Sequence, residues 1–301
     1  LTKHHHPQPW AEAHRRLGDA YLDLRTADLD LRFENLRRAT EHYEAALRVF
    51  TAEAYPDQWA AIQLYLGRVY REFPRRAQAE KFARAKSHFE AALDYYTKAN
   101  LPIQGAEAQL LLADLYLRMS RGGTESRAVE LERSRELIRQ SLEVFDDATY
   151  PQEWAFAQLA LGFILLESAE EDQATQVDQA IQHFLAAETK WAREIHAREW
   201  ATVQYSIGVA HLELAAREAP DHYQHAFARM HEALRVWSIE EYPEEWGRAQ
   251  SVLGVIYSQR PVGDAEENVR QAICYFENSL RTLSDDRFPE VDESPGRTDR
   301  D

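Results

Sequence analysis

Apolar and small residues recur along this chain at helical spacing. One stretch carries Trp59, Gln63, Leu66, Gly67 and Tyr70, at successive intervals of four, three, one and three residues. Because an α-helix turns once every 3.6 residues, these side chains share one stripe of a single helix. The chain has no Asn-Gly or Asp-Gly pair, and its β-branched residues do not alternate over a useful length. The pattern predicts an all-α fold.

The same stretch returns along the chain in six copies. Four copies are closely alike: PDQWAAIQLYLG from Pro56, PQEWAFAQLALG from Pro151, REWATVQYSIG from Arg198 and PEEWGRAQSVLG from Pro243. Two are weaker, PWAEAHRRLG from Pro9 and PIQGAEAQLLLA from Pro102. The Trp position falls at residues 10, 59, 105, 154, 200 and 246, so the copies are 46 or 49 residues apart. A fixed period of this size is typical of a repeat architecture.

A second apolar run follows each copy. It places a small residue, an aromatic residue four positions later and another small residue three after that, as in Ala85, Phe89 and Ala92. Small residues let two helix backbones approach closely, so each unit is predicted to be two antiparallel helices. Proline disfavours helix at the residue before it and suits the first turn of the next helix. We therefore expect new units to begin near Pro56, Pro102, Pro151, Ala197 and Pro243.

These observations predict one α-solenoid of about six antiparallel helix pairs, spanning residues 9–289. A short flexible segment, 1–8, is expected before it, and a polar tail, 290–301, after it. The predicted units are 9–55, 56–101, 102–150, 151–196, 197–242 and 243–288.

The succession of Leu66, Gly67 and Tyr70, then Ala85 and Phe89, resembles the tetratricopeptide repeat (TPR). The resemblance covers nearly the whole chain and implies a right-handed superhelix. Two features depart from the family: the units exceed its period of about 34 residues, and Gln occupies the column in which the family often has Trp. This long unit is similar to repeats found beside bacterial caspase-like peptidase domains of the CHAT type. That likeness implies the repeat region of a larger bacterial signalling or peptidase-associated protein.

Charge and composition narrow the function. The chain has 35 Lys and Arg against 51 Asp and Glu, a formal net charge of −16. Nucleic acids and anionic membranes both require clustered cations, so neither is an expected partner. A single cysteine, Cys274, excludes an internal disulfide and favours a reducing, cytoplasmic location. We expect that thiol to be buried and inert.

The sequence predicts no enzyme. It lacks the nucleophile elbow, the P-loop, the H-E-x-x-H zinc motif and the dinucleotide fingerprint. Histidines at 4–6, the pair His222 and His225, and the pair His211 and His231 supply too few ligands for a zinc site, so no metal or other cofactor is expected. The Trp column is expected to pack on the preceding second helix, and the Gln column to hydrogen-bond between neighbouring units.

The remaining positions of the first helices are the candidates for contact with a partner. In the TPR geometry the first helices line the concave surface, and residues two before, one after and five after each Gln face it. Apolar side chains there have two explanations: a partner covers them, or the solenoid itself buries them. The predicted contact residues are Leu64, Arg68, Arg71, Phe156, Leu159, Phe163, Tyr205, Val209 and Arg248.

The sequence therefore favours a non-enzymatic scaffold that binds a protein or peptide segment along its concave face. A basic segment fits the acidic exterior, and apolar anchors fit the aromatic positions. Two other classes remain open. One is a small-molecule sensor with a pocket at units four and five, and the other is a repeat protein that assembles with itself through its ends.

Overall fold

The computed structural model describes residues 5–24, 26, 28–73, 78–121, 127–168, 173–216 and 220–283, and nothing is said of the others, which include the predicted tail 290–301. The described residues form twelve helices and no strand, which confirms the all-α solenoid of six helix pairs. The helices are α1 Pro7–Asp23, α2 Leu29–Leu47, α3 Pro56–Glu72, α4 Gln78–Lys98, α5 Pro102–Ser120, α6 Arg127–Ser141, α7 Pro151–Ser168, α8 Gln173–Glu188, α9 Ala197–Ala215, α10 Asp221–Leu234, α11 Pro243–Gln259 and α12 Ala265–Leu283.

Proline starts most of the first helices. α3, α5, α7 and α11 begin at Pro56, Pro102, Pro151 and Pro243, and α9 begins at Ala197 without a proline. The missing N–H of proline costs nothing in a first turn, because the donors there have no partner within the helix. No described helix has the length and apolar content needed to cross a lipid bilayer.

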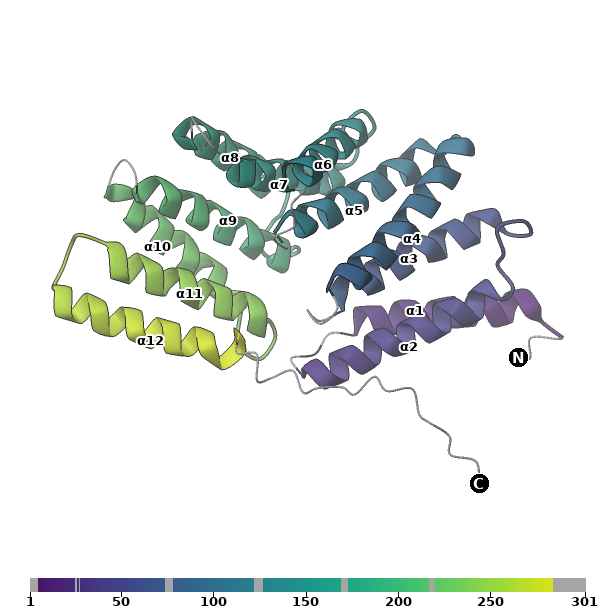
Figure 1. Cartoon of the computed structure of the whole chain (residues 1–301), viewed down its shortest axis with the longest axis horizontal. Coiled ribbons are helices and arrows are strands. Elements are labelled where there is room, and N and C mark those ends of the chain that lie inside the picture. Colours follow the sequence, from purple (N-terminus) through teal and green to yellow (C-terminus); the bar gives the residue numbers. More distant parts are fainter. Residues whose placement is uncertain are drawn as a thin grey trace, which may run out of the picture.

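The helix pairs follow an arch (Figure 1). Each second helix contacts its own first helix and the first helix of the next unit, while successive first helices also contact one another. The first helices consequently lie on the inner side of the arch and the second helices on the outer side. The pairs α1/α2 and α11/α12 form its two ends.

Glycine brings the two helices of a unit together. A Cβ atom added to Gly67 in α3 would lie 2.5 Å from Cδ1 of Phe89 in α4, well inside normal contact distance. Gly18, Gly162 and Gly254 face a ring of the paired helix in the same way. In unit three the column holds Ala113, and the facing position holds the smaller Ile138, which is fully buried. The sizes of the two columns are matched within the chain.

A column of large aromatic residues closes each of the first five units. The column was not recognised from the sequence, although its members recur at the same 46 or 49 residues as the repeat. Their side chains lie in the hydrophobic clusters between units. The members are Phe50, Tyr96, Phe145, Trp191 and Trp237, all buried.

The expected packing of the Trp column on the preceding second helix is found only in part. Trp200 packs against a cluster that includes α8, and Trp246 against one that includes α10. Trp59 instead packs against the cluster that units two and three form together. Trp154 likewise packs against the cluster of units four and five. In these two first helices, the Trp of the first turn thus packs towards the following unit.

Candidate partner-binding surface

Two of the predicted contact residues have little surface to offer. Leu64 on α3 is 6% exposed and Leu159 on α7 is 7% exposed. Both belong to hydrophobic clusters that join neighbouring units. Close packing of successive first helices covers these positions, so their expected exposure to a partner is not found.

Three aromatic residues on α7 and α9 are half-buried. The ring of Phe163 meets that of Phe184 at 5.4 Å between centroids, and the Arg121 guanidinium lies 4.9 Å from the Phe163 centroid. Tyr205 meets Trp237 at 5.5 Å. Phe156 packs against the clusters on both sides of α7. Val209, one turn from Tyr205, is also half-buried and packs against the cluster of the last two units.

An ion-pair cluster links α3 to α5. Asp114 Oδ2 accepts hydrogen bonds from Arg71 Nη1 and Arg118 Nε, each at 2.9 Å. Burial disfavours the charged form of Asp114, but the two guanidinium groups outweigh burial and hold the pKa of this carboxyl below its usual value. Burial also lowers the pKa of Arg71. The Nε of Arg71 is buried and has no hydrogen-bond partner among the described residues.

On the inner side of the arch, nearby protein restricts the hydration of side chains that are still exposed to solvent. Glu107 on α5 is exposed. Its surroundings nevertheless hinder hydration enough to raise the pKa of Glu107, and Glu153 raises it further while Arg68 lowers it. An exposed group with restricted hydration is the behaviour expected on a concave surface. Arg68 itself makes no hydrogen bond or ion pair within the described part of the chain.

Side chains from distant units influence one another across this surface. Asp114 raises the pKa of Arg118, and Glu244 of α11 adds to the effect although it lies three units further along. Arg248, an exposed predicted contact residue, pairs with Glu244 at 3.5 Å. Burial raises the pKa of Tyr205, and the charges of Arg248 and Arg121 oppose that shift. We call the inward-facing residues of α3, α5, α7, α9 and α11 the inner surface. Its main polar and aromatic members are Arg68, Arg71, Glu107, Asp114, Arg118, Phe156, Phe163, Tyr205 and Arg248.

Unit three supplies a part of this surface that was not predicted from the sequence. The predicted contact positions came from the other units only. The same register in the copy that begins at Pro102 gives Glu107, Leu110 and Asp114. Applying the repeat to every unit would have identified both carboxylates.

The Gln column connects the two helices of one unit rather than neighbouring units. His88 Nδ1 and Gln63 Oε1 are 2.6 Å apart, and the pair formed by His183 Nδ1 and Gln158 Oε1 is 2.7 Å apart. In unit five Arg229 donates to Gln204 Oε1 at 2.6 Å. The expected bond between units is found once among the described residues, from Gln204 Nε2 to Glu188 at 2.7 Å.

The histidines and the cysteine differ from expectation. His211, His222 and His225 cluster together, with His211 and His222 joined through their Nδ1 atoms at 3.0 Å, whereas His231 packs on Phe227. Within the described ranges, no group of three or more His, Cys, Asp or Glu is placed to hold a metal ion. Cys274 is exposed, so its expected burial is wrong.

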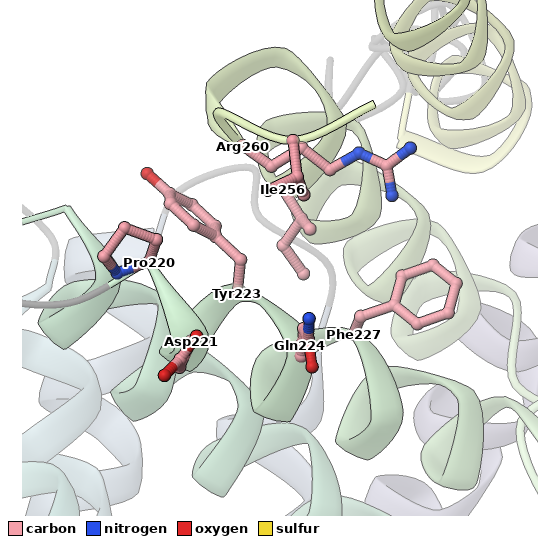
Figure 2. A pocket seen from close by; sticks show the side chains of 8 residues that line it. Pro220, Asp221, Tyr223, Gln224, Phe227, Ile256 and Arg260 are labelled. Carbon is pink, nitrogen blue, oxygen red and sulfur yellow. The ribbon is translucent and has the colours of Figure 1, made fainter. Parts of the chain in front are cut away.

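A small hollow lies between units five and six (Figure 2). Tyr223 and Phe227 line it from α10, and Ile256 and Arg260 from the end of α11. Its volume is about 200 Å³, which is below the range of about 300–1,000 Å³ typical of ligand pockets. It is not at units four and five, where a sensor pocket was considered.

Comparison with known proteins adds no assignment. No protein-family model matches the chain, and no curated protein matches it. The resemblance to tetratricopeptide repeats, and to the repeats that accompany CHAT peptidases, stays a prediction based on the residues quoted above.

Proposed function

We propose that this chain is a non-enzymatic scaffold that binds a protein or peptide segment along its inner surface. The observation that carries the proposal is the composition of that surface. The half-buried aromatic residues of units four and five and the arginines of units two, three and six all belong to first helices, and the first helices lie on the inner side of the arch (Figure 1). Aromatic residues and arginine are the side chains that most often dominate binding energy at protein interfaces.

The expected partner segment combines an apolar anchor with a carboxylate. Phe163 and Tyr205 each keep part of a ring accessible for the anchor. Arg68 makes no hydrogen bond or ion pair among the described residues, so its guanidinium can donate to a carboxylate. The net charge of −16 would meanwhile favour encounter with a segment that is basic elsewhere.

Selection from a displayed random-peptide library tests the proposal and requires no candidate partner. We expect enriched peptides whose affinity falls about tenfold or more for Arg68→Glu and for Tyr205→Ala, as for interface hot spots. Arg135→Glu is the matched control, because Arg135 is an exposed arginine on α6, which is a second helix.

Thermal melting of the same variants separates binding from folding. Arg68→Glu should melt like the wild type, since this side chain makes no hydrogen bond or ion pair in the described structure. Enriched peptides that bind Arg68→Glu and Tyr205→Ala at full strength would place binding elsewhere. A library that yields no peptide at all would also contradict the proposal.

A further inference from the structure

The last helix exposes a continuous apolar stripe. Val269, Ile273, Phe276 and Leu280 of α12 are 54%, 51%, 36% and 62% exposed. Their spacing of four, three and four residues places them on one face along three turns of the helix. We call these four residues the α12 stripe.

The repeat itself shows what normally covers this face. In unit four the equivalent residues include Val177, Ile181 and Phe184, which are buried. They are covered by Val203 and Ile207 of the next first helix, α9, in one hydrophobic cluster. Phe276 occupies the same place as Phe184 against its glycine, yet no first helix follows it among the described residues. Within the described residues, the α12 stripe is therefore a helix-binding face that no helix covers.

We propose that a second copy of this chain covers the stripe, with the two α12 helices antiparallel about a two-fold axis. A stripe spaced four, three and four reads the same in both directions. Antiparallel pairing consequently sets Val269 opposite Leu280 of the second copy and Ile273 opposite Phe276 of the second copy. Such an isologous interface is the commonest form of homodimer.

The charges beside the stripe fit the same arrangement. Glu266, Arg270, Glu277 and Arg281 follow one edge of it, and all four are exposed. In the antiparallel pair, Arg270 lies beside Glu277 of the second copy, and Glu266 beside Arg281 of the second copy. In a parallel pair this charged edge would instead lie beside the opposite edge of the second copy, which carries Ala265, Ala272 and Ser279, so these charge pairs would not form.

The other end of the solenoid is a poorer match for the stripe. At the equivalent positions α1 exposes Leu17 between Ala13 and Ala20. Head-to-tail stacking of copies would bury small side chains there, whereas the two-fold pair buries four large apolar side chains from each copy. The larger apolar area favours the two-fold dimer.

Sedimentation of the 301-residue chain over a wide range of concentrations tests the proposal. We expect a monomer–dimer equilibrium that Ile273→Glu shifts to monomer by at least about tenfold in the dissociation constant. Cys274→Glu is the matched control: this exposed neighbour points away from the stripe, so dimerisation should persist. Helical circular dichroism and melting temperature verify that both variants fold.

Charge reversal identifies the antiparallel geometry. Arg270→Glu alone and Glu277→Arg alone should each weaken the homodimer, because each places like charges side by side. A mixture of the two single variants should form the heterodimer, in which both pairs become opposite in charge.

A wild-type chain that remains monomeric at its highest soluble concentration would overturn the proposal. So would a dimer that tolerates Ile273→Glu, or single variants that show no preference for each other. Open-ended growth that Leu17→Glu abolishes would assign the stripe to head-to-tail stacking instead. None of these results depends on the inner surface.

Discussion

At the scale of single residues, the glycines of the first helices limit how closely each pair can pack. A methyl group at Gly67 has no room beside the ring of Phe89. We expect Gly67→Ala to lower the free energy of unfolding by about 1–3 kcal/mol, as overpacking does, despite the higher helix propensity of alanine. Urea unfolding measures the difference.

Gly105 is the matched control for that variant. It also lies in a first helix and is buried, but a Cβ there would meet only Cβ of Tyr96, at an ordinary distance of 3.9 Å. Gly105→Ala should stabilise the chain by about 0.4–1 kcal/mol. Equal effects at both positions would contradict the role assigned to the facing ring.

The matched sizes in unit three suggest a rescue. Combining Gly67→Ala with Phe89→Ile copies the pairing of Ala113 with Ile138. We expect the double variant to be more stable than the sum of the two single losses predicts, by about 0.5 kcal/mol or more. Strict additivity would show that these two columns are not coupled.

At the scale of helices, the Asp114 carboxylate joins α3 to α5 through two arginines. Asp114→Asn leaves Arg71 without its closest counter-charge in a mostly buried position. We expect a loss of about 2–3 kcal/mol, somewhat below the cost of breaking a fully buried pair. Asp94→Asn is the control, because its pair with Lys98 is exposed on both sides and should contribute less than about 1 kcal/mol.

The same column of a first helix is not equally buried in every unit. Leu66 on α3 is almost fully buried, whereas Leu161 on α7 is half-buried. Leu66→Ala should therefore cost about 2–5 kcal/mol, and Leu161→Ala clearly less. Equal shifts in the urea midpoint for the two variants would mean that Leu66 and Leu161 are equally buried in solution.

Element boundaries were predictable, while several side-chain environments were not. The effect of proline is a matter of local backbone chemistry, so proline locates the starts of α3, α5, α7 and α11. Exposure depends on neighbours that are distant in sequence. Cys274 lies between the apolar residues Ala272 and Phe276 in sequence, yet it points to solvent on α12, as the equivalent Gln182 does on α8.

At the scale of the whole molecule, histidines make stability dependent on pH. Burial lowers the pKa of six of them below the usual 6.5, and that of His211 to about 4. The unfolded chain therefore binds more protons below pH 6.5 than the folded chain does. Stability should fall as the pH drops from about 7 towards 5, since the folded state favours neutral imidazole.

Urea unfolding at a series of pH values measures this dependence, and His211→Gln should flatten it. Glu107 acts in the opposite sense, because its raised pKa favours the protonated carboxyl in the folded chain; its stabilising effect grows as the pH falls through that raised pKa. Stability that stays constant or rises between pH 7 and 5 would contradict the assigned burial of the histidines.

The curvature of the arch was the least predictable property. Repeat period and helix pattern predict the six pairs, but the approach of Glu244 to Arg118 depends on the angles at several successive junctions. No local sequence pattern specifies these angles, and small errors in predicting each of them accumulate along the chain. The sequence could thus predict which residues belong to the inner surface, but not which residues of distant units lie close to one another there.

Contacts limited to neighbouring units also make the arch elastic. Each pair touches the pairs before and after it, so five junctions act like springs in series. A slight twist at every junction adds up to a large displacement at the two ends. A ligand bound near the middle of the arch would therefore change the distance between α1 and α12 by altering the angles at a few junctions. No helix would need to unfold.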